Sequence, residues 1–166
     1  MRIIIEGADM TGKTTLAKYI VDNYPNMSYI HVNSKDPNNV EFYNITLEKT
    51  NVVFDRHFIG ETIYPTLFNR QGNVFDAEFE LIQRKAERLG YKIVVLTATK
   101  EQFLERLVDR PNEPKQIVEN WESINESFKN VAYKNNIKVI NVTDYKTMED
   151  LVREVLKWHI MEQTLK

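Results

Sequence analysis

The sequence predicts an α/β fold, in which a five-stranded parallel sheet carries helices on both faces. Five short apolar or β-branched runs alternate along the chain with segments whose apolar residues recur at helical spacing. Strands that are apolar throughout, each followed by a helix, are typical of parallel sheets buried on both sides. The chain has 166 residues, of which 42% are hydrophobic, so we expect one core and a single domain over residues 1–166.

The first three strands are expected at 2–6, 28–32 and 51–57. The first is followed by a helix that starts at Lys13 and stops before Pro25, because proline cannot continue a helix. The turn-forming sequence at the start of 36–49 predicts a turn that continues as a short helix before the third strand.

The second half of the chain continues the alternation. Apolar residues from Phe75 onward step by three and four up to Gly90, which is placed to cap the helix. Strands are then expected at 91–99 and 137–143, and helices at 100–109, around 117–131 and near 147–163. Trp121 and Trp158 fall on the apolar stripes of the last two helices, which predicts core positions for both.

Composition excludes several classes of function. The formal net charge is -2 with both signs interspersed, and this gives no basic surface for a nucleic-acid polymer or an anionic membrane. No apolar run has the length of a membrane span. The chain has no cysteine, which excludes disulfides and thiolate zinc sites and favours a cytoplasmic protein. His31, His57 and His159 are not at metal-ligand spacing, so no zinc site is expected.

The stretch RIIIEGADMTGKTT contains the pattern GxxxxGK followed by threonine, between the first strand and the first helix. In this arrangement the loop amides and the helix N-terminus bind phosphate oxygens, the lysine reaches the terminal phosphates, and the threonine hydroxyl binds Mg²⁺. The pattern therefore predicts a P-loop NTP hydrolase fold that uses ATP. The expected ATP-binding residues of the loop are Gly7, Ala8, Asp9, Met10, Thr11, Gly12, Lys13, Thr14 and Thr15.

The end of the third strand carries an aspartate and an arginine that point to phosphate and metal binding. Asp55 lies at the carboxyl edge of the predicted sheet, where it can organise Mg²⁺ together with Thr14, and Arg56 next to it can hold a second phosphate through two hydrogen bonds. A regulatory GTPase would need an NKxD sequence after a late strand and a DxxG switch, and neither is present. A larger motor or transporter ATPase would need a longer chain, so a small kinase is the expectation.

Two stretches resemble the thymidylate kinase family. EGADMTGKTT resembles its P-loop, and DRHFIGETIY resembles its second conserved stretch. The resemblance implies that Asp9 contacts the 3′-hydroxyl of an acceptor nucleotide, that Arg56 binds its monophosphate, and that Tyr64 lies where a 2′-hydroxyl would clash. It also implies a homodimer as the expected assembly.

The resemblance extends to FLERLVDRPNE, which is similar to the helix and lid of these kinases and of deoxynucleoside kinases. It implies a lid near 106–116, in which Arg106 contacts the donor nucleotide and Arg110 compensates charge during transfer. Met10 stands where some family members carry an arginine, which leaves that role to Arg110, Arg106 or Lys115.

The acceptor base is left open by the sequence. Thymidylate kinases place an arginine and a base-stacking phenylalanine between the second strand and the DR sequence, whereas residues 33–50 contain no arginine. Phe42 and Tyr43 are the candidates for stacking on the base, and both also fit the core of a short helix. A modified pyrimidine or a broader range of deoxynucleotides is compatible with this difference.

The expected reaction is transfer of the γ-phosphoryl group from ATP to a deoxynucleoside 5′-monophosphate, dTMP or a related pyrimidine nucleotide. Lys13, Asp55, Arg56 and Arg110 are the expected catalytic residues. A nucleoside acceptor would benefit from a carboxylate base soon after the second strand, and only Asp36 is near, in a turn sequence. Two alternatives remain: a deoxynucleoside kinase or other small-molecule kinase, and a regulatory protein that binds nucleotide without transferring phosphate.

Overall fold

Parallel strands form the centre of the molecule. In the computed structural model, residues 1–69, 74 and 76–163 are described, with the backbone alone for 158–163. The strands are β1 (Arg2–Gly7), β2 (Ser28–His31), β3 (Val52–Asp55), β4 (Lys92–Thr97) and β5 (Lys138–Asn141). They form one sheet in the order β2-β3-β1-β4-β5, and every neighbouring pair is parallel.

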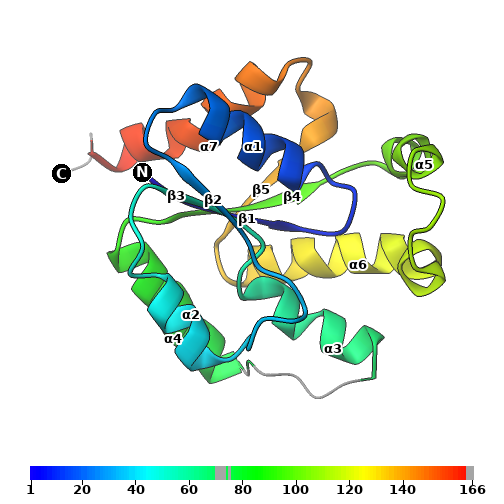
Figure 1. Cartoon of the computed structure of the whole chain (residues 1–166), viewed down its shortest axis with the longest axis horizontal. Coiled ribbons are helices and arrows are strands. Elements are labelled where there is room, and N and C mark those ends of the chain that lie inside the picture. The colour runs from blue at the N-terminus through cyan, green and yellow to red at the C-terminus, as the bar shows by residue number, and fades with distance from the viewer. Residues whose placement is uncertain (70–73, 75, 164–166) are drawn as a thin grey trace.

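Helices cover both faces of this sheet. On one face lie α1 (Lys13–Asn23) and α7 (Met148–Gln163), and on the other lie α4 (Asp76–Arg88) and α6 (Lys115–Lys134) (Figure 1). The shorter helices are α2 (Val40–Thr46), which contacts α4, α3 (Tyr64–Leu67) and α5 (Lys100–Val108). Two 3₁₀ turns complete the described chain, η1 (Ile59–Thr62) and η2 (Val142–Asp144).

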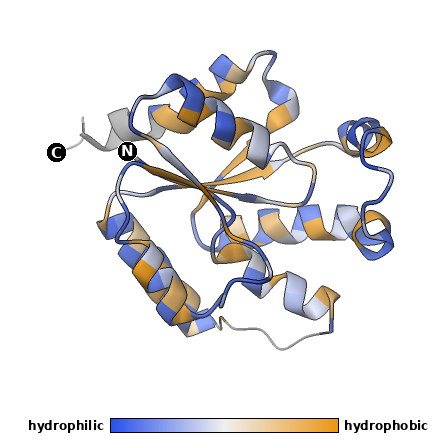
Figure 2. Cartoon of the chain, viewed as in Figure 1, coloured by the Kyte–Doolittle hydropathy of each residue, from blue (hydrophilic) through white to orange (hydrophobic). Residues whose placement is uncertain are grey.

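The burial of the strands follows from their position in the sheet. Every residue of β3 and β4 is buried, and so is every residue of β1 after Arg2, because helices cover both faces of these inner strands. The edge strands β2 and β5 are partly exposed. Figure 2 shows the inner strands as a hydrophobic centre and the helices with hydrophilic residues on their outer sides.

The register of the sheet brings the predicted site together. Ile5 is paired with Asp55, and Gly7 is paired with Leu96, so the ends of β1, β3 and β4 lie at one edge. The chain leaves β1 at this edge and enters α1, which packs against β1, β2 and β3. The P-loop and the residues after β3 are therefore neighbours, although more than forty residues separate them in the sequence.

The predicted fold class is confirmed, including the strand count and the helices on both faces. The sequence did not predict η1 and α3, two short elements that follow β3. Pro65 lies in the first turn of α3, where its missing N–H breaks no helical hydrogen bond. Phe75, used to predict the start of α4, lies outside the described residues, and so do the side chains of Trp158 and His159. Among the described helices, none is long and apolar enough to cross a membrane.

Candidate active site

The P-loop turns tightly between β1 and α1. Gly7 has a φ of 138°, and a Cβ at this position would lie 2.2 Å from the carbonyl oxygen of Leu96 on the neighbouring strand. Gly12 has a φ of 91° and lies directly before the first residue of α1. Glycine is thus required at both ends of the loop, and the loop delivers the N-terminus of α1 to the sheet edge, where an anion is favoured.

Three successive carbonyl groups of the loop are held by side chains. Lys13 donates to the carbonyl oxygen of Ala8 at 2.5 Å, Trp121 donates to that of Asp9 at 2.7 Å, and Arg106 donates to that of Met10 at 2.5 Å. Lys13 is buried, and burial followed by the charge of Arg56 lowers the pKa of its ammonium group to about 8. Phosphate oxygens would add to the negative charge of the nearby carboxylates and so favour the charged form of Lys13.

Asp55 lies against the first turn of α1. Its Oδ2 accepts hydrogen bonds from the hydroxyl of Thr14 at 2.5 Å and the hydroxyl of Tyr29 at 2.9 Å, and His31 Nδ1 lies 3.1 Å away. Burial alone would raise the pKa of Asp55, but the hydrogen bond from Thr14 and the charge of Lys13 outweigh it and hold the pKa below its usual range. The group is therefore an ionised carboxylate at neutral pH.

The residues around Asp55 fit a magnesium ion. Oδ1 of this buried carboxylate has no hydrogen-bond partner among the described residues, and the hydroxyl of Thr14 lies beside it. A carboxylate and a hydroxyl next to a phosphate-binding loop are the protein ligands that Mg²⁺ uses with nucleotides, with water completing its shell. No group of three or more His, Asp or Glu side chains that would hold a metal by itself occurs in the described part of the chain.

Arg56 adopts an uncommon backbone conformation directly after β3. Its φ is 70°, in the left-handed region that non-glycine residues seldom occupy. The turn directs its guanidinium toward Asp9, with which it forms an ion pair. The hydroxyl of Tyr64 donates to the other oxygen of the same carboxylate at 2.8 Å. Burial would raise the pKa of Asp9, but Arg56, Lys13 and Tyr64 hold it below its usual range.

Glu6 stabilises the turn that follows β3 through hydrogen bonds to its backbone, a role that the sequence analysis did not identify. The fully buried carboxylate lies at the end of β1, and its Oε1 accepts the backbone N–H groups of His57 and Ile59 at 2.9 Å each. Burial raises the pKa of Glu6 to about 7, although these hydrogen bonds and the charges of Lys13 and Arg56 oppose the rise. The position of Glu6 directly before the P-loop glycine was the available signal.

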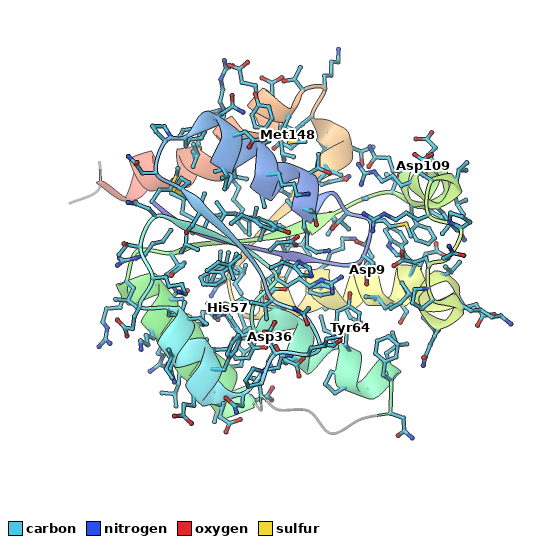
Figure 3. The ribbon with its side chains drawn as sticks, in the orientation of Figure 1. Asp9, Asp36, His57, Tyr64, Asp109 and Met148 are labelled. Atoms are coloured by element: carbon cyan, nitrogen blue, oxygen red, sulfur yellow. The ribbon has the colours of Figure 1, made fainter. Side chains whose placement is uncertain are left out.

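Two cavities meet at Asp9 and Arg56, which line both of them. The larger has a volume of about 650 Å³ and contains the P-loop from Asp9 to Thr15, together with Asp55 and residues 145–148 before and within α7. The smaller, of about 290 Å³, lies between the end of β2, η1, α3 and the start of α6. In Figure 3, Met148 and Asp109 lie on the side of the larger cavity, Tyr64 and His57 on the other side, and Asp9 between them.

Most of the predicted donor residues line the larger cavity. Arg106 and Arg110 do so as well as Asp9–Thr15. Gly7 and Ala8 do not line it and are buried beneath the loop. Tyr145, Lys146 and Thr147 also line it, and the sequence analysis did not single them out.

The predicted acceptor residues divide into two groups. Asp9, Arg56 and Tyr64 line the smaller cavity, whereas Phe42 and Tyr43 do not. Tyr43 is fully buried, donates its hydroxyl hydrogen to Asn38 and packs against His57, so the structure places it in the core. Phe42 packs edge-on against Tyr43.

Phe68 is a further aromatic residue that lines the smaller cavity, next to Tyr64. It stacks on Tyr64 with ring centroids 6.0 Å apart and remains 40% exposed. Its spacing of four residues from Tyr64 was a signal for this position. Asn33, Ser34 and Asn38, from the region that left the base open, also line the cavity.

The segment between α5 and α6 contacts both cavities. Asp109 and Arg110 line the larger, and Glu113 and Pro114 line the smaller. The segment predicted to be a lid therefore lines both cavities. Lys115 lines neither and forms an exposed ion pair with Glu119.

Solved structures with a similar fold include two kinases and a protein solved with a bound nucleotide. The YorR protein from Bacillus subtilis, solved in complex with phosphorylated GDP, superimposes with a TM-score of 0.81 at 19% identity, over 99% of this chain and 98% of that one. A deoxyadenosine kinase from M. mycoides with bound dCTP gives 0.60 at 17% identity, over 95% of this chain and 99% of that one.

Shikimate kinase from Aquifex aeolicus is also similar, with a TM-score of 0.53 at 17% identity over 99% of each chain. No protein-family model matches the sequence, and no curated protein sequence matches it either. At these identities the comparisons establish the fold, and the chemistry rests on the residues of the site.

Proposed function

We propose that this protein transfers the γ-phosphoryl group of ATP to a deoxynucleoside 5′-monophosphate, either dTMP or a related pyrimidine nucleotide, modified or unmodified. The observation that carries the proposal is the meeting of two cavities at Arg56 and Asp9. The larger cavity contains the P-loop from Asp9 to Thr15, and the smaller cavity offers the half-buried guanidinium of Arg56 where the two cavities meet. Such an arrangement places a second anionic substrate opposite the terminal phosphate of the donor.

The proposed chemistry is an in-line displacement. An oxygen of the acceptor phosphate attacks the γ-phosphorus, the bond from that phosphorus to the β–γ bridging oxygen breaks, and ADP leaves with the electron pair. Lys13 and the loop amides hold the β- and γ-phosphates, Arg56 holds the acceptor phosphate, and Arg110 approaches the charge that develops between them. Thr14 and Asp55 would hold Mg²⁺, which neutralises phosphate charge when bound.

The side chains after β2 favour a monophosphate over a nucleoside. Asp36, the carboxylate nearest to the end of this strand in the sequence, accepts the backbone N–H of Asn33 at 2.8 Å and thereby closes a turn. It does not line the smaller cavity, whereas Asn33 and Ser34 do. A monophosphate already presents an ionised oxygen and needs charge neutralisation, which Arg56 supplies, rather than a general base.

The sugar and the base would be recognised by different parts of the smaller cavity. Tyr64 is held by Asp9 beside Arg56, which supports its proposed place against a deoxyribose. Phe68 is the exposed aromatic ring that a base can stack on, and we propose it in place of Phe42 and Tyr43.

A deoxynucleoside kinase remains a second candidate, because carboxylates do reach the smaller cavity. Asp9, Glu61 and Glu113 line it, and any of these placed near a 5′-hydroxyl would serve as a base. Deoxyadenosine kinase is also among the similar structures.

The deciding experiment measures ADP release from Mg-ATP with deoxynucleoside monophosphates, ribonucleoside monophosphates and deoxynucleosides offered separately. We expect the strongest response with dTMP or another pyrimidine deoxynucleotide, and loss of turnover by orders of magnitude in Lys13→Ala. A response restricted to nucleosides would replace the proposal by the second candidate. ATP binding without ADP release for any acceptor would instead indicate a regulatory nucleotide-binding protein.

A further inference from the structure

Trp121 makes a contact that its core position does not require. The side chain is 2% exposed and stacks on Phe103 of α5, with ring centroids 4.4 Å apart and planes inclined by 15°. Its indole N–H donates to the backbone carbonyl of Asp9 at 2.7 Å, across 112 residues of sequence. Filling a core position requires apolar volume but no N–H group, so the N–H requires a separate explanation.

The accepting carbonyl belongs to the residue shared by both cavities. The carboxylate of Asp9 is bound by Arg56 and by the hydroxyl of Tyr64 in the smaller cavity. The N–H of Met10 lies on the opposite side of the Asp9–Met10 peptide bond from the carbonyl, because a trans peptide is planar. A hydrogen bond that holds the Asp9 carbonyl therefore also fixes the direction of the Met10 N–H in the P-loop. It likewise fixes the backbone from which the Asp9 side chain extends into the smaller cavity.

Of the side chains that hold the two neighbouring carbonyls, Lys13 and Arg106 are charged, and the third, Thr11, belongs to the loop itself and donates its hydroxyl hydrogen to Ala8 at 2.9 Å. Lys13 and Arg106 hold the carbonyls of Ala8 and Met10, and both side chains line the larger cavity, where phosphate oxygens would compete for them. The indole N–H has no charge and Trp121 does not line this cavity, so its hydrogen bond persists when phosphate binds.

We propose that Trp121 is a positioning residue, whose indole N–H holds the P-loop at Asp9 in the geometry that serves both substrates. The effect on the acceptor rests on the proposed function, whereas the effect on nucleotide binding does not. Ile117 lies one turn earlier on the same helix and lines the smaller cavity, so α6 connects that cavity to the P-loop.

The test replaces Trp121 by phenylalanine, which keeps an aromatic ring against Phe103 and removes the N–H. The matched control is Ile124→Val, one turn further along α6, which alters an equally buried residue whose side chain has no hydrogen-bonding group. We expect Trp121→Phe to weaken ADP binding, measured by titration calorimetry, and to raise the acceptor KM, each about tenfold. Ile124→Val is expected to lower the Tm while both constants stay within twofold of the wild type.

ADP and acceptor constants of Trp121→Phe within twofold of the wild type would overturn the proposal, even with a lowered Tm. If this variant does not fold, the tryptophan isostere benzothienylalanine, which has sulfur in place of the N–H, is incorporated in a Trp158→Phe background and compared with that background containing tryptophan. The same tenfold weakening is expected there, and unchanged ADP binding would again overturn the proposal. Absence of phosphoryl transfer in the wild type, with weakened ADP binding in the variant, would refute the proposed function alone.

Discussion

Arg56 combines a strained backbone with a half-buried charge, and both features serve the position of its guanidinium. Its φ of 70° is stabilised by hydrogen bonds that β1 provides, since its own N–H reaches the carbonyl of Ile5 at 2.9 Å and Glu6 accepts the next N–H groups. In the described structure its charge is balanced by Asp9. An acceptor phosphate would compete for the same guanidinium, which can form two parallel hydrogen bonds with it.

Replacement of Arg56 by lysine tests this geometry. Lysine keeps the charge, but its ammonium group cannot form the two parallel hydrogen bonds that a planar guanidinium forms with a phosphate. We therefore expect the acceptor KM to rise about 10- to 100-fold. The KM for ATP should change much less, because Lys13 and the loop amides remain. Steady-state kinetics with both substrates provides the measurement. Arg84→Lys, on the exposed surface of α4, is the control, and an equal effect in both variants would contradict the assigned role.

Glu6 predicts a pH dependence of stability. Its pKa is about 7 in the fold and 4.5 in its ordinary state, so the folded protein retains a proton that the unfolded chain releases. This contribution is complete below pH 4.5 and is lost as the pH rises through 7. His57 acts in the opposite sense below pH 6.5, because burial lowers its pKa to about 3.

The variant Glu6→Gln isolates the Glu6 contribution, because glutamine keeps an oxygen for the N–H groups of His57 and Ile59 but does not titrate. We expect the free energy of unfolding of the wild type, relative to the variant, to fall by roughly 2 kcal/mol between pH 5 and pH 7.5. Urea denaturation at these two pH values measures the difference. A constant difference would show that Glu6 does not titrate in this range.

At the scale of elements, the connection between α5 and α6 lines both cavities, and the proposed function therefore predicts that it acts on both substrates. Arg110 on this connection lines the larger cavity while Glu113 lines the smaller one. The side chain of Arg110 is exposed in the described structure. A shift of this segment toward bound nucleotides would bring its charge to the transferred phosphate and exclude water.

Arg110→Ala is therefore expected to lower kcat at least tenfold with little change in the Tm, since the side chain forms no part of the core. Lys115→Ala is the matched control, because it removes an equally exposed cation that lines neither cavity. Single-turnover transfer separates this effect from product release. Equal rates for the two variants would remove Arg110 from the proposed mechanism.

At the scale of the whole molecule, what the sequence could predict depended on how local each interaction is. The P-loop and α1 were predictable because strand, glycines, lysine and helix follow one another within residues 2–23. The smaller cavity was predictable only in part, because residues from β2, η1, α3 and α6 meet there. The core position of Trp121 followed from helical spacing, but its bond to Asp9 depends on a tertiary contact between distant segments.

Aromatic residues show the same limit. Phe42, Tyr43 and Phe68 all lie on short helices or at their ends, and spacing alone does not decide which of them faces a ligand. The packing of α2 against α4 places Tyr43 in the core, whereas Phe68 follows the last residue of α3 at the mouth of the smaller cavity. Phe68 lies four residues after Tyr64, so the segment that follows β3 supplies two aromatic side chains that line the smaller cavity.

The two cavities predict how the whole molecule responds to ligands. Because the cavities share Asp9 and Arg56 but are otherwise lined by different residues, ADP and dTMP should bind at the same time.

A bisubstrate analogue, in which adenosine and thymidine are joined through five phosphates, should occupy both cavities. It loses the translational freedom of one molecule on binding, whereas ADP and dTMP lose that of two. We expect it to raise the Tm more than saturating ADP and dTMP together, since tighter binding to the folded state gives greater stabilisation at equal concentration. Differential scanning fluorimetry gives the measurement, with ADP plus thymidine as the control in which Arg56 has no acceptor phosphate to bind. A mixture of ADP and dTMP that stabilises no more than ADP alone would mean that the two nucleotides compete for one site, and the assignment of the smaller cavity to the acceptor would then fail.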